Sequence, residues 1–137
     1  MEQSTITLVQ DSFEKVKPIA STAAEIFYSK LFELDPALKP LFPSSDDAMK
    51  VQGNKLMSML ASAVAGLSNL EALIPVLQDL GKRHVDYKVE ASHYETVGAA
   101  LLGTLEAGLG EDFTPDVKNA WASVYTTMAD VMIKASY

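Results

Sequence analysis

The chain contains no cysteine among its 137 residues. This absence excludes disulfide bonds, thiolate metal sites and a cysteine nucleophile, and it suits a reducing compartment such as the cytoplasm. Histidine is nearly as scarce, because only His84 and His93 are present. Any histidine-dependent function must therefore use one or both of these two side chains.

Positive charge is also in short supply. The 11 Lys and Arg residues stand against 18 Asp and Glu residues, which gives a net charge of −7. An acidic surface repels phosphate backbones, so nucleic-acid binding is disfavoured. An unbroken apolar run of about 18 residues is missing, and so is the basic, apolar start of a secretion signal. We therefore expect a single cytoplasmic domain, residues 1–137, without membrane insertion.

Strand signals are nearly absent, since the chain shows no sustained apolar–polar alternation and no Asn-Gly or Asp-Gly turn. Apolar residues recur instead at spacings of three and four, which predicts an all-α fold of six or seven helices. The predicted core face of the last helix consists of Val117, Trp121, Val124, Met128 and Val131.

Turn and capping residues predict where these helices begin and end. The predicted N-terminal caps are Asp35, Ser44 or Ser45, Ser68, Ser92 and Thr114. Pro18 and Pro75 predict a break or an irregular turn, whereas Gly108 and Gly110 are expected to end the helix that begins after Ser92.

The two histidines are the first candidates for chemistry. His84 ends a predicted helix one turn after Leu80, and a neutral imidazole between apolar walls is a good axial ligand for haem iron. From the residues alone, an ordinary core or surface histidine is the more common alternative. A zinc pair of His84 and His93 lacks a third ligand at a suitable spacing, although Glu90 and Glu95 are near.

Five segments, taken in order, resemble a known family. They are "FYSKLFELDPALKPLF", "VQGNKLM", "NLEALIPVLQDLGKRH", "SHYETVGAALL" and "AWASVYTTMADVM". Together they cover nearly the whole chain and resemble the globins, most closely the bacterial single-domain haemoglobins of the Vitreoscilla type and the globin half of flavohaemoglobins. This resemblance implies a three-over-three helical sandwich of about six to eight helices. It also implies one haem b in a pocket between the distal and proximal helices.

The resemblance assigns roles to particular residues. It implies that His84 is the proximal ligand of the iron and that Phe42 packs flat on the porphyrin. It implies that Tyr28 and Gln52 face bound dioxygen on the distal side, with Leu56 as an apolar wall. Without it, Tyr28 would be an amphipathic aromatic residue and Gln52 a solvated helix residue.

Further positions are implied to surround the haem. Leu80, Val89, Tyr94 and Val97 match lining positions, and Arg83 and His93 are placed to meet the propionates. Met57 and Met59 lie on the distal helix, where helical spacing favours core packing over thioether ligation.

Two positions depart from the family pattern. Ser136 stands where relatives have a glutamate that hydrogen-bonds with the proximal histidine and tyrosine, so a strongly electron-donating histidine is not expected. Lys88 stands where relatives often have glycine, which implies modest strain if that turn needs a positive φ.

The resemblance implies reversible binding of dioxygen, for transport or storage, as the first function. The alternative is nitric oxide dioxygenation, which needs an external reductase because the chain has no GxGxxG dinucleotide fingerprint. A haem-based gas-sensing or interaction module ranks last. The expected partners are dioxygen, nitric oxide and a reductase, and the expected state is a monomer or weak homodimer.

Overall fold

The computed structural model describes residues 2–42, 45–86, 90 and 92–136. Over these residues the chain forms six α-helices, four short 3-10 helices and no strand, which confirms the all-α prediction. The α-helices are α1 (Gln3–Val16), α2 (Ala20–Leu34), α3 (Asp46–Gly66), α4 (Leu70–Asp86), α5 (His93–Leu109) and α6 (Pro115–Ser136). The 3-10 helices are η1 (Lys17–Ile19), η2 (Pro36–Leu41), η3 (Leu67–Asn69) and η4 (Gly110–Asp112).

Three of the predicted N-terminal caps make the expected hydrogen bond. The Asp35 carboxylate accepts from the backbone N–H of Ala37 at 3.2 Å and starts η2. The Ser45 hydroxyl accepts from the Ala48 N–H at 3.1 Å, and the Thr114 hydroxyl accepts at 3.3 Å ahead of α6. Each bond satisfies a backbone donor that the helix itself leaves without a partner.

The predicted role of Ser92 as a cap is only partly correct. Ser92 does precede α5, but its side chain makes no capping hydrogen bond. The backbone of Ser92 is already helical, with φ at −63° and ψ at −26°, whereas a capping residue is typically extended. Just before the helix, the Nδ1 atom of His93 accepts from the backbone N–H of Glu90 at 3.0 Å.

Two other predicted boundaries are shifted. Gly108 lies inside α5, and only Gly110, with φ at +56°, ends that helix. Ser68 lies in η3, ahead of α4, and its hydroxyl accepts from the Gln10 side chain at 3.0 Å. Pro75 is accommodated inside α4.

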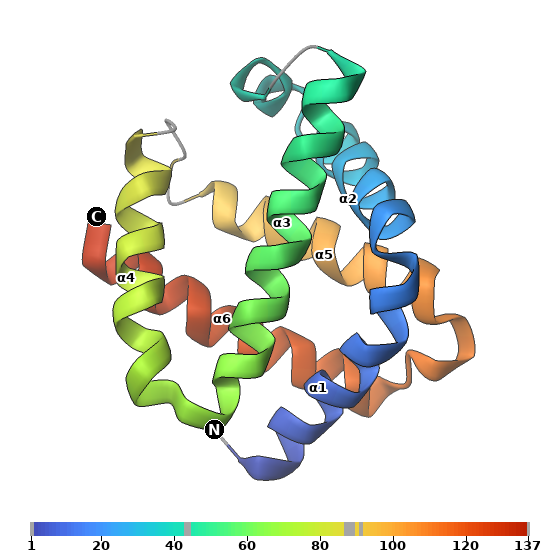
Figure 1. Ribbon diagram of the computed structural model, residues 1–137, viewed down its shortest axis with the longest axis vertical. Helices are drawn as coiled ribbons and strands as arrows, with labels where there is room; N and C mark the ends of the chain where they lie inside the picture. The colour runs from blue at the N-terminus through green and yellow to red at the C-terminus, as the bar shows by residue number, and fades with distance from the viewer. Residues whose placement is uncertain (1, 43–44, 87–89, 91, 137) are drawn as a thin grey trace.

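The helices pack as two crossing layers, with α1, α3 and α4 over α2, α5 and α6 (Figure 1). The closest helix pairs include α4 with α6, α2 with α5 and α1 with α6. At the centre of the α1–α6 contact, the Trp121 indole N–H donates to the Ser12 hydroxyl at 2.8 Å. The predicted core face of α6 is buried except for Val131, which is half-buried.

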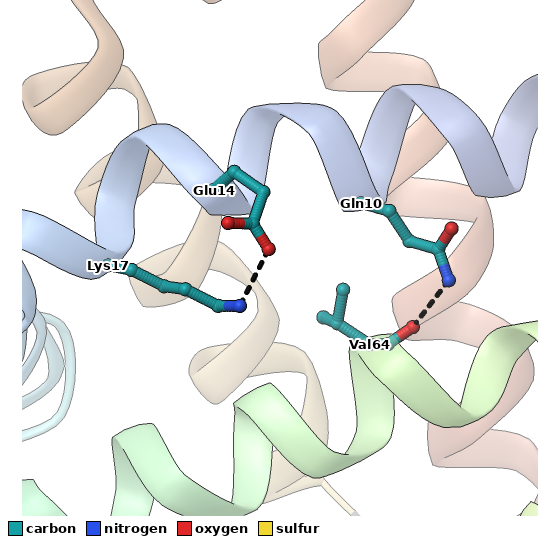
Figure 2. A network of polar contacts seen from close by, with 4 residues as sticks. All are labelled: Gln10, Glu14, Lys17 and Val64. Carbon is teal, nitrogen blue, oxygen red and sulfur yellow. Dashed lines mark hydrogen bonds and ion pairs between the residues drawn. The ribbon is translucent and has the colours of Figure 1, made fainter.

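A side-chain bridge ties α1 to the end of α3. Figure 2 shows the Gln10 amide, which donates to the Val64 carbonyl at 3.0 Å, and the nearby exposed pair of Lys17 and Glu14. Because Gln10 contacts Ser68 as well, it fixes the turn from which α4 departs. The direction of α4 decides where His84, near its end, is presented.

The region from Asp46 to Val85 contains an 18-residue window with a mean hydropathy of 1.6, so by length and composition alone it is apolar enough to cross a membrane. In the fold it is not one straight helix, because η3 separates α3 from α4 and the two run in opposite directions (Figure 1). Meeting this criterion is weak evidence for a membrane-spanning helix, since core helices of soluble proteins also meet it.

Candidate functional site

His84 is held by a hydrogen bond within its own helix. Its Nδ1 atom lies 2.8 Å from the carbonyl oxygen of Leu80, one turn earlier in α4. Since a carbonyl oxygen only accepts, Nδ1 must carry the proton and donate, which leaves the lone pair on Nε2. Burial lowers the pKa of His84, and the bond with Leu80 offsets this in part. The imidazole is therefore neutral near pH 7, the form that ligates metals.

Tyr94 faces this imidazole from the first turn of α5. The two rings meet edge to face, with centroids 6.0 Å apart and planes at 64°. Tyr94 is buried, and its backbone carbonyl accepts a hydrogen bond from the Tyr125 hydroxyl at 2.6 Å. The start of α5 is thus anchored to α6, which limits how far Tyr94 can move from His84.

Tyr125 can reach Tyr94 because Gly98 has no side chain. A Cβ atom at position 98 would lie 2.8 Å from Cε2 of the Tyr125 ring. Burial, and then the nearby Tyr94, raise the pKa of Tyr125 above its usual range, so its hydroxyl remains a donor. Sequence reasoning missed this pair, although a glycine on the apolar face of a helix signals a close approach.

Tyr28 and Gln52 are brought together on the other side of the fold. Tyr28 lies in α2 and is buried, and its hydroxyl is near enough to the Gln52 side chain of α3 for that side chain to influence its pKa. Burial raises the pKa of Tyr28, and the Gln52 side chain lowers it by a smaller amount. The phenol is therefore protonated at neutral pH and can donate a hydrogen bond.

Three aromatic rings surround Tyr28. Phe27 and Phe42 meet its ring edge to face, with centroids at 5.2 and 5.3 Å, and Phe32 stacks on it at 6.0 Å. Phe42 follows η2 directly, so this cluster joins α2 to the corner that precedes α3. Sequence reasoning singled out Phe42 but not Phe32.

The apolar candidates lie beside two hollows. Leu56 and Val97, with Met57, border an apolar cavity of about 120 Å³. Leu80 borders an apolar groove of about 220 Å³ between α3 and α4, together with Met59. Met57 is half-buried, as core packing predicts, whereas Met59 is 37% exposed at the edge of the groove.

The remaining candidates lie apart from these groups or outside the described part of the chain. Arg83 forms an exposed ion pair with Asp79 at 3.1 Å, which contributes little to stability. Val89 and Lys88 lie outside the described residues, and so does the side chain of Ser136, the last residue of α6. Within residues 2–42, 45–86, 90 and 92–136, no group of three or more His, Asp or Glu could hold a metal ion.

Comparison with known proteins gives one family and modest identities. The globin family model matches residues 25–132. Neuroglobin-1 of Oncorhynchus mykiss is 31% identical over 136 positions, covering 91% of this chain and 86% of the relative. The flavohemoproteins of Bacillus subtilis and Halalkalibacterium halodurans are 28% and 30% identical, over 97% and 96% of this chain. The chain spans about a third of their length, 33% and 34% respectively.

The contact between Gly98 and Tyr125 can be tested with two alanine variants of α5. Gly98→Ala should lower the free energy of unfolding by roughly 1–3 kcal/mol, because the new methyl group meets a fixed ring. Gly103→Ala is the control, since its Cβ would meet only the flexible Lys30 side chain. It should gain up to about 1 kcal/mol in helix propensity. Urea unfolding followed by circular dichroism measures both, and equal effects would contradict the packing described.

Proposed function

The chain belongs to the globin family, and from this premise we propose that it binds one haem b and uses it to bind dioxygen reversibly. Family membership supports a haem cofactor and gas binding. The choice of haem b, of dioxygen and of the residues below is our proposal, as are a cytoplasmic location and any partner protein.

The residues of the candidate site fit a flat iron macrocycle. His84 offers a neutral imidazole whose ring is oriented by the hydrogen bond from Nδ1 to Leu80. Aliphatic side chains from three helices border apolar hollows, Leu56 and Val97 one of them and Leu80 the other. One strong nitrogen donor and apolar walls are what a protein-bound haem requires. Haem, when bound, supplies a ferrous iron that can take a diatomic gas as its sixth ligand.

On the proximal side, the protein's task is to hold one nitrogen in place. The hydrogen bond from Nδ1 to Leu80 fixes both the tautomer and the direction of the ring. Tyr94 closes one side of the ring, and Tyr125 fixes Tyr94. This arrangement is the main support for His84 as the ligand. In the other histidine, His93, the accepting nitrogen Nδ1 is already bonded to the N–H of Glu90, so the proton is on Nε2.

On the distal side, the task is to donate hydrogen bonds to a polar gas ligand. Tyr28 has a protonated hydroxyl in a buried setting, and Gln52 lies within hydrogen-bonding reach of it. A donor that is oriented before the ligand arrives loses little free energy on binding it, and each such bond contributes about 1 kcal/mol or more. Together the two side chains would slow the release of dioxygen.

The proximal assignment predicts the behaviour of His84→Ala. After reconstitution with hemin, the unaltered chain and His93→Ala should show the same strong Soret band in the absorption spectrum. His84→Ala should lose or shift that band, because the one other histidine of the sequence, His93, is not expected to take its place. An unchanged spectrum in His84→Ala would overturn the assignment.

The distal assignment predicts the behaviour of Tyr28→Phe. This change removes one hydroxyl and preserves the ring that packs among Phe27, Phe32 and Phe42. The dioxygen dissociation rate should rise roughly fivefold or more, since about 1 kcal/mol or more of ligand stabilisation is lost. Stopped-flow mixing measures this rate, and a rate equal to that of the unaltered chain would show that Tyr28 does not contact the ligand.

Nitric oxide dioxygenation is the second candidate, favoured by the similarity to two flavohemoproteins. The reaction joins one nitric oxide and one dioxygen and takes up one electron to give nitrate. That electron must come from a reductase external to the globin fold. Tyr28 and Gln52 would hold dioxygen while nitric oxide enters.

Nitrate yield separates the two functions. With a flavin reductase and NADH supplied, a dioxygenase should form about one nitrate for each nitric oxide consumed over many turnovers. A chain that serves only storage should stop after a single turnover because its oxidised form is not reduced again. The Tyr28→Phe variant, which holds dioxygen less firmly, should form nitrate more slowly if the reaction uses this site.

A further inference from the structure

Phe32 lies one helical turn after Tyr28 in α2, and its ring packs beside the Tyr28 ring in a nearly parallel, offset arrangement. The centroids are 6.0 Å apart, and the planes are inclined by only 27°. Residues four apart on a helix are neighbours on its surface, so the backbone of α2 itself sets this contact. Phe32 is half-buried.

Phe32 also contacts Phe42, the aromatic residue at the end of η2. Their rings meet edge to face with centroids 5.4 Å apart and planes at 64°. Phe42 in turn meets Tyr28 at 5.3 Å and 65°. The three rings therefore form a closed triangle in which each ring limits the rotation of the other two.

We propose that Phe32 is a positioning residue of the distal site, which holds the Tyr28 ring so that its hydroxyl stays directed toward Gln52. This inference rests on the proposed function of Tyr28 as a hydrogen-bond donor to the gas ligand. The Phe32 ring is nearly parallel to the Tyr28 ring, whereas Phe27 and Phe42 approach edge to face. A tyrosine ring turns about two side-chain torsions, and a neighbouring ring in contact with it obstructs that turn.

The geometry separates Phe32 from the other two aromatic neighbours. Phe27 is buried and borders the 120 Å³ cavity, so its packing serves the core as well. Phe42 already has a proposed place against the haem. Phe32 is therefore the best residue to substitute. Its replacement removes the near-parallel ring contact of Tyr28 and leaves the two edge-to-face contacts in place.

A double-mutant cycle tests whether Phe32 acts through the Tyr28 hydroxyl. In the haem-loaded chain, Phe32→Leu should raise the dioxygen dissociation rate about threefold or more, the size of coupling expected between residues in contact. In the Tyr28→Phe background the same substitution should change the rate little, because no hydroxyl remains to be directed. A residue that only fills space would alter the rate equally in both backgrounds, and that result would overturn the inference.

The C–O stretching band of the carbon monoxide complex provides a second readout that does not depend on activity. A hydrogen-bond donor near the ligand lowers this frequency, so Phe32→Leu should broaden the band or shift it toward that of Tyr28→Phe. Phe113→Leu is the matched control, since Phe113 is half-buried and packs on the core without being one of the rings that contact Tyr28. Its band and dissociation rate should match those of the unaltered chain.

The outcomes distinguish this inference from the proposed function. If Tyr28→Phe leaves both the rate and the band unchanged, the distal role of Tyr28 is wrong and the inference falls with it. If Tyr28→Phe changes both and Phe32→Leu changes neither, only the inference is wrong. Changes in both variants, with no effect of Phe32→Leu in the Tyr28→Phe background, support the two claims together.

Discussion

The hydrogen bond between the Leu80 carbonyl and Nδ1 of His84 is the contact on which the rest of the site depends. It joins two residues four apart inside α4, and it fixes the tautomer and the orientation of the imidazole ring. A peptide carbonyl is a neutral acceptor, so it leaves the imidazole less electron-rich than a carboxylate would. That favours reversible ligand binding over strong activation of the ligand.

The two sides of the site are ordered by different forces. On the proximal side, hydrogen bonds decide the geometry, from His84 to Leu80 and from Tyr125 to the Tyr94 backbone. On the distal side, ring packing around Tyr28 decides the geometry, and the position of the Tyr28 ring brings its hydroxyl near Gln52. Polar groups in a buried setting are strong donors only when they are held in place, which both arrangements achieve.

Regular features were predictable from the sequence, because periodicity and capping are local. Asp35 and Ser45 cap as expected, and Trp121 lies at the centre of the core. Ser92 was misjudged because its backbone is already helical, with φ at −63° and ψ at −26°, whereas a capping residue is typically extended. Phe32 and Tyr125 were missed for a different reason. Their importance comes from which ring or carbonyl they meet in three dimensions, and their places in the segments that resemble the family do not reveal these contacts.

The central claim is that the Nε2 atom of His84 binds the haem iron, and resonance Raman spectroscopy of the ferrous haem-loaded chain tests it most directly. The account predicts one iron–nitrogen stretching band that shifts to lower frequency when histidine is labelled with the heavy nitrogen isotope and that is unchanged in His93→Ala. Because the sequence has only two histidines, the assignment is then unambiguous. A band that fails to shift on labelling, or that disappears in His93→Ala, would contradict the account.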